Sequence, residues 1–366
     1  MTFRHESLQI GGEFEFNPDD YARRPLAERV ETNSPTCLWI DTGRSALLVA
    51  ATAIRKQGGL PRVWLPAYCC ESIARPFTQA EFEVRYYPVG RNLQCGSSLP
   101  QPLPGESLLF IDYFGHRNWP MVEAAPKYIN EGVWVIEDRV HASLSVAADL
   151  VGSFSVTSDR KVLPVPDGAT ISSRAPLDLR KIGIELSDPD EAFVSAKLTG
   201  KILRAVDTPD ETFLALFEEA ETRVEGRIVP RSRSWLSCWM SARLDREDAA
   251  RKRRMNWLTL LDILRQSRLL GRLCPVMDNL GEDDVPLGMP VRVVDDLRDS
   301  LRAFLTTREI YCPVHWPLNH LPADSAFSEE RQLQSSLLTL PTDQRMSSEH
   351  LEYFAKSLVA FFEECC

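Results

Sequence analysis

The sequence lacks long apolar runs and has fewer basic than acidic residues. None of its 366 residues falls in a run of about 18 apolar residues, so it predicts no transmembrane helix. The 42 Lys and Arg residues are outnumbered by 52 Asp and Glu residues, which gives a formal net charge of −10. Such an acidic chain is poorly suited to non-specific binding of nucleic acid or anionic lipid. We therefore expect neither nucleic acid nor a membrane among its partners.

The sequence also shows no CxxC motif and no pattern that predicts a secretory signal. The nine cysteines are scattered, and none has the CxxC spacing that is typical of a zinc site. The segment Met1–Phe16 is polar and acidic, without the basic start and apolar stretch of a signal peptide. These features predict reduced thiols, no bound metal and a cytoplasmic location.

Between Cys37 and Pro176, short apolar segments alternate with helical patterns. A helix is predicted over Ser45–Lys56, because its apolar residues have helical spacing and Gly58-Gly59 follow as a stop signal. Strands are predicted at four short segments bounded by Pro, Gly or charge: Val63–Pro66, Val84–Val89, Leu108–Asp112 and Val133–Ile136. Strands and helices in alternation indicate an α/β fold with a mostly parallel sheet.

The length predicts about two domains, and the pattern changes after Pro176. Helical segments over 190–220 and 236–270 give way to a mixture of strand-like and helical segments, and an amphipathic helix over 347–362 comes last. We predict an N-terminal arm over 1–35, a large α/β domain over 36–235, a connecting helix over 236–273 and a small C-terminal α+β domain over 274–366.

Two acids follow a predicted strand directly. In open α/β sheets, ligands bind beyond the carboxyl ends of the strands, which is where Glu137, Asp138 and then His141 stand. Carboxylates at the end of an apolar strand are costly unless they are paired or used. Taken alone, the pattern fits a structural role as well as a functional one.

The segment Asp41-Thr-Gly-Arg-Ser-Ala46 leads into the first predicted helix. Backbone N–H groups at such a helix start are free to hold a phosphate, although this is neither a Walker A loop nor a full GxGxxG motif. Further along, Lys161 lies between two predicted strands and is followed by prolines and a glycine. A lysine amine held in a crevice beside other cations loses its proton more easily and becomes a nucleophile.

In this order, the helix start, the strand-end acid and the lysine match what pyridoxal phosphate requires. Its phosphate needs free N–H groups, its pyridine nitrogen needs a carboxylate that keeps it protonated, and its aldehyde needs a lysine. The cofactor predicted from the sequence is therefore pyridoxal 5'-phosphate.

Several motifs also resemble those of a known family. They are Thr42-Gly-Arg-Ser-Ala-Leu47, Leu65-Pro-Ala-Tyr-Cys69, Ile136-Glu-Asp-Arg-Val-His-Ala142 and Tyr311-Cys-Pro-Val-His315. With them the chain resembles the DegT/DnrJ/StrS-type nucleotide-sugar aminotransferases, which have the type I fold of aspartate aminotransferase. The resemblance implies a large domain with a mostly parallel seven-stranded sheet flanked by helices, and a smaller C-terminal domain.

The resemblance also assigns roles to individual residues. Lys161 would bond to the cofactor aldehyde and Asp138 would meet the pyridine nitrogen, so these two would be catalytic. His141 would lie against the ring or its hydroxyl. The remaining positions are Gly43, Arg44, Ser45 and Ser155 at the phosphate, Tyr68 or Cys70 against the ring face, and Tyr311 and His315 toward the substrate.

The implied reaction moves an amino group from a glutamate-like donor to a keto group of a nucleotide-linked sugar, in a homodimer with shared active sites. One family feature is not recognisable, namely the Gly-Tyr-Asn-Tyr-Arg loop by which a neighbouring subunit closes the site. Arg231–Leu236 stands in its region, where Ser232 or Ser234 could replace that contact. A binding or regulatory protein of the same fold without turnover is therefore the alternative, and a plain α/β protein with ion-paired loops is a third.

Overall fold

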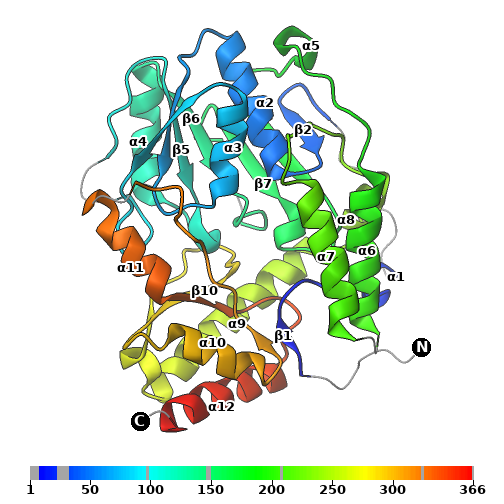
Figure 1. Cartoon of the computed structure of the whole chain (residues 1–366), viewed down its shortest axis with the longest axis vertical. Coiled ribbons are helices and arrows are strands. Elements are labelled where there is room, and N and C mark those ends of the chain that lie inside the picture. Colours follow the sequence, from blue (N-terminus) through cyan, green and yellow to red (C-terminus); the bar gives the residue numbers. More distant parts are fainter. Residues whose placement is uncertain are drawn as a thin grey trace.

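A computed structural model describes residues 8–22, 33–95, 99–145, 150–206, 209–322 and 325–364. Its largest feature is a seven-stranded sheet in the order β2-β8-β7-β6-β5-β3-β4 (Figure 1). All neighbouring strands are parallel except β8, which runs antiparallel to both of its neighbours. The strands are β2 (Cys37–Ile40), β3 (Arg62–Pro66), β4 (Glu83–Tyr87), β5 (Ser107–Ile111), β6 (Trp134–Asp138), β7 (Phe154–Ser158) and β8 (Ala169–Ser173).

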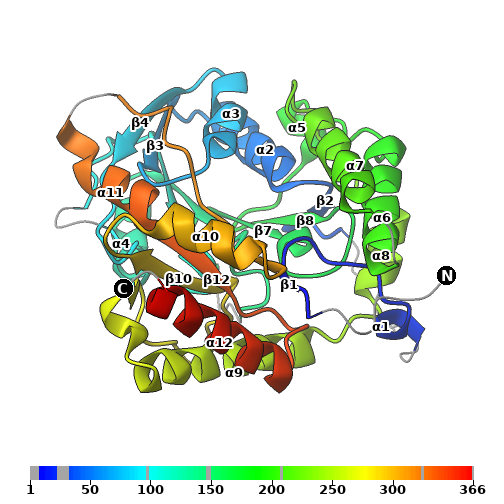
Figure 2. The ribbon, with the colours of Figure 1, turned by 60° about the horizontal axis from the view of Figure 1, so that its bottom comes forward.

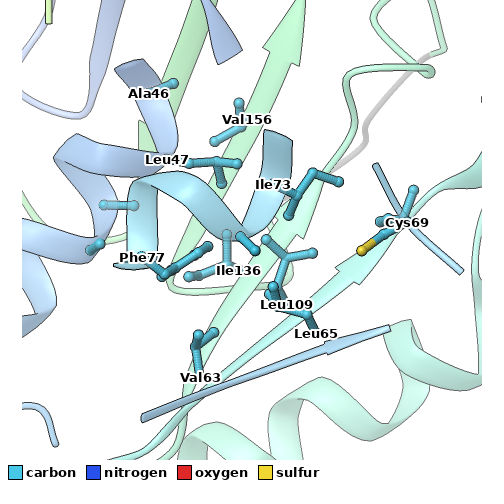
Figure 3. Packing of buried hydrophobic residues seen from close by; sticks show 14 of the residues in the cluster. Ala46, Leu47, Val63, Leu65, Cys69, Ile73, Phe77, Leu109, Ile136 and Val156 are labelled. Carbon is cyan, nitrogen blue, oxygen red and sulfur yellow. The ribbon is translucent and has the colours of Figure 1, made fainter. Parts of the chain in front are cut away.

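Helices cover both faces of this sheet. On one face lie α2 (Gly43–Lys56) and α3 (Glu71–Gln79), and on the other lies α4 (Trp119–Asn130). Figure 3 shows the first interface, where Leu47 and Phe77 of the helices meet Ile136 and Val156 of the strands. Because α2 buries a row of alanines, its backbone approaches the sheet closely.

Strand alternation decides which face each polar residue at the end of β6 occupies. Ile136 belongs to the core beneath α2, whereas Val135 packs beneath α4. Successive side chains on a strand point to opposite faces, so Asp138 lies on the α2 side and Glu137 on the α4 side.

Two helices stand beside the sheet. α6 (Glu191–Ala205) and α7 (Asp210–Arg223) lie side by side in Figures 1 and 2. They approach closely at Gly200, where an added Cβ would come within 2.6 Å of the Phe217 ring. The short helices α5 (Leu179–Ile182) and α8 (Trp235–Ser241) precede and follow this pair.

The C-terminal part has its own sheet and its own core. β9 (Leu273–Pro275), β10 (Gly288–Val293) and β12 (Leu337–Pro341) form an antiparallel sheet in the order β12-β10-β9. Around it stand α9 (Arg246–Gln266), α10 (Arg298–Thr306) and α12 (Ser348–Glu364), whose apolar faces share one cluster with the sheet, while α11 (Ser328–Ser336) packs against the large domain. The short 3-10 turns are η1 (Tyr113–Gly115), η2 (Asp159–Lys161), η3 (Leu269–Gly271) and η4 (Ser325–Phe327).

The N-terminal segment bridges the two parts of the molecule. β1 (Ile10–Gly11) pairs in parallel with β11 (Ile310–Tyr311), and α1 (Asp19–Ala22) follows. In Figures 1 and 2 the dark blue strand lies between α6 and the C-terminal part. Residues 1–7 and 23–32 of the predicted arm are outside the described residues, and the predicted domain boundaries stay a prediction.

One predicted helix is interrupted. The segment over 236–270 forms α8 and α9, separated by a break after Ser241. The break arises because Asp245 caps α9, and its carboxylate accepts from the Asp248 N–H at 2.9 Å. No helix in the described part of the chain has the length and apolar character needed to cross a bilayer.

Candidate active site

Asp138 is the last residue of β6 and is 4% exposed. One of its oxygens accepts from the Val140 N–H at 2.9 Å. Burial raises the pKa of Asp138 to about 6, and the nearby Asp112 contributes to this rise. Lys161 acts in the opposite direction and lowers the pKa of Asp138, so the amine is close enough to act on this carboxylate electrostatically.

The turn that carries Lys161 is fixed by a buried carboxylate. Asp159 accepts from Ser143 at 2.8 Å and pairs with Arg246 at 3.0 Å and Arg233 at 3.2 Å. This network holds η2 directly after β7, so Lys161 projects from a rigid element. Burial lowers the pKa of Lys161, and the neighbouring Arg160 lowers it further. A lowered pKa increases the fraction of the amine that is uncharged and nucleophilic.

Lys161 opens into a cavity of about 360 Å³ between the large domain and the C-terminal part. His141 and Arg160 line it from the large domain, and Tyr311 and His315 line it from the C-terminal part. The structure therefore brings both predicted substrate residues, Tyr311 and His315, to the cavity of the predicted catalytic lysine.

The two histidines of this cavity are uncharged. His141 Nδ1 accepts from the Phe114 N–H at 3.4 Å, so the proton of the neutral ring is on Nε2. Burial lowers the pKa of His141 well below its usual value, with smaller contributions from His315 and Lys161. Burial and Lys161 lower the pKa of His315 to about 3. A free Nε2–H on His141 can donate a hydrogen bond to a ligand.

The start of α2 offers unused hydrogen-bond donors. The Thr42 side chain accepts from the Ser45 N–H at 3.3 Å, which satisfies one group of the first turn. Among the described residues, no acceptor meets the backbone N–H of Gly43 or Arg44. An added Cβ on Gly43 would come within 3.2 Å of Val140, so glycine suits this crowded position. Free N–H groups at a helix start favour an anion.

Tyr68 and Cys70 occupy different environments. Tyr68 is fully buried, and its hydroxyl donates to the His315 carbonyl. Its ring lies 5.5 Å from that of Trp316, so it is part of an aromatic cluster. Cys70 begins α3 and is close enough to Lys161 to affect the pKa of that amine. Of the two candidates for the ring face, Cys70 is the one that acts on this lysine electrostatically.

Ser155 is not brought to the start of α2. It pairs in register with Glu137, whereas Val156 pairs with Asp138. By strand alternation, Ser155 points to the α4 side, opposite the face where Asp138 and Gly43 lie. The register argument removes Ser155 from the set of residues that could hold the phosphate.

The two acids after β6 have separate tasks. Glu137 lies within 3.2 Å of the Arg117 guanidinium, which also pairs with Asp112 at 2.7 Å. This ion network fixes the loops that follow β5 and β6. Asp138 has no such ion pair among the described residues, and one of its oxygens accepts from a backbone N–H instead. No cluster of three or more metal-ligating side chains occurs in the described ranges.

Comparisons with known proteins identify the fold. No protein-family model matches the sequence, and no curated protein matches it. Among solved structures, the chain is similar to the aminotransferase TlmJ from Streptoalloteichus hindustanus, with 17% identity, 93% of this chain and 89% of that chain covered, and a TM-score of 0.63. A DegT/DnrJ/EryC1/StrS aminotransferase from Brucella abortus gives 16% identity, 89% and 85% coverage, and a TM-score of 0.59.

Helicobacter pylori PseC, an aminotransferase involved in the biosynthesis of pseudoaminic acid, gives 14% identity, 90% and 87% coverage, and a TM-score of 0.64. The chain thus has the fold of the DegT/DnrJ/EryC1/StrS-type aminotransferases. The predicted fold class, a mostly parallel α/β sheet flanked by helices, is confirmed.

Proposed function

We propose that this protein is a pyridoxal phosphate-dependent aminotransferase that transfers an amino group from a glutamate-like donor to a keto group of a nucleotide-linked sugar. One observation carries the proposal: β6 ends at Asp138, the turn that carries Lys161 follows the neighbouring strand β7, and the amine is close enough to lower the pKa of Asp138. The fold shared with sugar aminotransferases supports the choice of reaction and substrate class.

The residues present fit the cofactor. Asp138 supplies a buried carboxylate for the pyridine nitrogen, and the neutral His141 supplies an Nε2–H for the ring hydroxyl. The open N–H groups of Gly43 and Arg44 suit its phosphate. Lys161 offers an amine of lowered pKa to its aldehyde. Cys70, which acts on that amine electrostatically, would contact the ring face.

Each residue has a defined task in the reaction. When bound, the cofactor supplies an electron-withdrawing ring that stabilises negative charge at the substrate α-carbon. Asp138 would keep the ring nitrogen protonated, and His141 would orient the ring through its Nε2–H. The Lys161 amine would take the proton from the donor α-carbon as a general base and then, as a general acid, deliver it to the former aldehyde carbon of the cofactor, so that the donor leaves as its keto acid. Trp316 is partly buried and stacks on His141, with ring centroids 5.5 Å apart, in an aromatic cluster that also contains Tyr68.

Spectroscopy and an amino-transfer assay test the proposal. The purified protein incubated with pyridoxal phosphate should turn yellow, and borohydride should bleach it permanently. With glutamate and a keto-sugar nucleotide, 2-oxoglutarate should accumulate. Protein that takes up no cofactor would contradict the proposal.

A cofactor-binding protein without turnover is the second candidate. It is favoured by the segment Arg231–Leu236, which is engaged within its own chain. Ser234 is 5% exposed and donates to Asp167 at 2.6 Å, and Ser232 pairs with Ile40 at the sheet edge. The Ser234 hydroxyl is therefore not free to replace the missing neighbour-subunit loop. Yellow protein that transfers no amino group to keto sugars or keto acids would support this candidate.

We also propose a homodimer, formed through the exposed face of α8. Trp235 is 81% exposed and Trp239 is 43% exposed, which is unusual for two tryptophans one helical turn apart. Light scattering after gel filtration should show a dimer for the natural protein and a monomer for Trp235→Glu. Trp119→Glu, at an exposed tryptophan on α4, is the matched control and should stay dimeric. A natural protein that elutes as a monomer would contradict the proposal.

A further inference from the structure

Two buried lysines lie beside the cavity that contains Lys161. Lys197 and Lys201, one turn apart on α6, are each 1% exposed. Both amines contact one carboxylate: Glu13 lies 3.0 Å from Lys197 Nζ and 3.4 Å from Lys201 Nζ. Lysines are almost never fully buried unless they are paired, so an anion is required beside these two amines.

Arg160 and Glu221 extend this cluster toward the catalytic lysine. Glu221 lies 2.7 Å from both Arg160 Nη1 and Lys197 Nζ. The cluster then contains three cations (Arg160, Lys197 and Lys201) and two carboxylates (Glu13 and Glu221), and Lys161 adds a further amine. Burial alone would raise the pKa of Glu13, but Lys201, Lys197 and Arg160 lower it to about 2. The surroundings of the Glu13 carboxylate therefore favour an anion strongly.

Glu13 reaches this position from the N-terminal segment, and its backbone is held independently of its carboxylate. Arg345 Nη1 donates to the Glu13 carbonyl at 3.1 Å, and Lys201 Nζ donates to the Phe14 carbonyl at 3.2 Å. At Gly12 a Cβ would come within 2.7 Å of the Arg204 guanidinium, so the segment lies tightly against α6. The backbone can stay in place while the Glu13 side chain rotates.

The Glu13 side chain is accessible from the cavity. It is 39% exposed, although both of its lysine partners are buried. Glu13, Arg160 and Lys161 all line the cavity of about 360 Å³, which is large enough for an amino acid of the size of glutamate. A second carboxylate entering this cavity could therefore exchange with that of Glu13.

We propose that Lys197, Lys201 and Arg160 form a carboxylate subsite, that Glu13 occupies it when no substrate is present, and that the side-chain carboxylate of a dicarboxylic amino donor replaces Glu13. The Glu13 side chain is a carboxylate on two methylene groups, and the side chain of a free glutamate donor is the same group. The inference rests on the proposed function, because it assigns the residues that would recognise the donor at that same site.

Calorimetric titration with 2-oxoglutarate, the keto acid of such a donor, tests the subsite without added cofactor. Glu13→Gln removes the competing carboxylate and should tighten binding of 2-oxoglutarate about tenfold, since charged hydrogen bonds are the stronger kind. Lys197→Met should weaken it about tenfold or more. Neither substitution should change the affinity for 2-oxopentanoate, which has the same chain length as 2-oxoglutarate and lacks its distal carboxylate.

The controls separate the subsite from general charge effects. Glu123→Gln makes the same charge change at an exposed position on α4 and should bind 2-oxoglutarate as the natural protein does. Circular dichroism checks that Lys197→Met folds, and Glu13→Gln provides the test if it does not. The proposal would be overturned if Glu13→Gln bound 2-oxoglutarate with the affinity of the natural protein. It would also be overturned if the substitutions changed the binding of inorganic pyrophosphate and left that of 2-oxoglutarate unchanged.

The two proposals fail in distinguishable ways. If the variants changed 2-oxoglutarate binding as expected but the protein took up no coloured cofactor, only the proposed function would be contradicted. Cofactor colour with no effect of Glu13→Gln on 2-oxoglutarate binding would contradict only the subsite.

Discussion

Lys161→Arg is expected to abolish the yellow colour of the cofactor-treated protein and to lower amino-transfer turnover by about 10³-fold or more. Arginine keeps the positive charge but cannot be deprotonated, so it can neither attack an aldehyde nor move a proton. The cavity would keep its charge balance, which isolates the chemistry of the amine. Absorbance in the visible range and the rate of 2-oxoglutarate formation measure the two effects.

Other lysines provide the control for this experiment. Lys181→Arg changes a side chain that is 84% exposed and should leave both colour and turnover at the level of the natural protein. Lys197 and Lys201 are buried nearby, and each holds Glu13 through its amine. Persistent borohydride-sensitive colour in Lys161→Arg would show that the cofactor bonds to another lysine and would contradict the assignment.

The central sheet could be predicted because its strands are buried on both faces. Leu108–Asp112 and Val133–Ile136 read as continuous apolar segments, and the structure places β5 and β6 there. Helices α3 and α4 were not predicted, because Pro76 and Pro126 lie inside them. Proline removes a helical hydrogen bond, and the packing of apolar faces that offsets this loss is not visible in the sequence.

The sequence also predicts some residues of the candidate site and misses others. Asp138 and His141 stand close to one strand end, so the local sequence marks them, and Lys161 follows the next strand. The misassignment of Ser155 to the phosphate could not be recognised without the register of β6 and β7, since a shift of one residue moves a side chain to the other face. The cluster of Glu13, Lys197 and Lys201 joins positions far apart in the chain, and no spacing pattern could reveal it.

Asp138→Asn should stabilise the cofactor-free protein while lowering turnover by about 100-fold or more. Asparagine keeps the shape of the side chain and can still accept from the Val140 N–H, so the fold should be retained. It cannot keep the pyridine nitrogen charged, and turnover falls for that reason. The substitution also removes the buried carboxylate of Asp138, which lies near Asp112. The folded protein disfavours the ionised form of the Asp138 carboxylate.

The gain in stability should depend on pH in a defined direction. The pKa of Asp138 is about 6 in the folded protein, above the reference value of 3.8, so folding favours the protonated carboxyl. Below about pH 4 both states are protonated and the two proteins should differ little; the difference should grow between pH 4 and 6 and then level off at about 1–3 kcal/mol. Thermal unfolding without cofactor at pH 5 and pH 8 measures this, with Asp262→Asn as an exposed control that should show no such trend. A variant less stable than the natural protein at pH 8 would show that the carboxylate of Asp138 holds the fold together, and its assignment to the cofactor nitrogen would lose its physical basis.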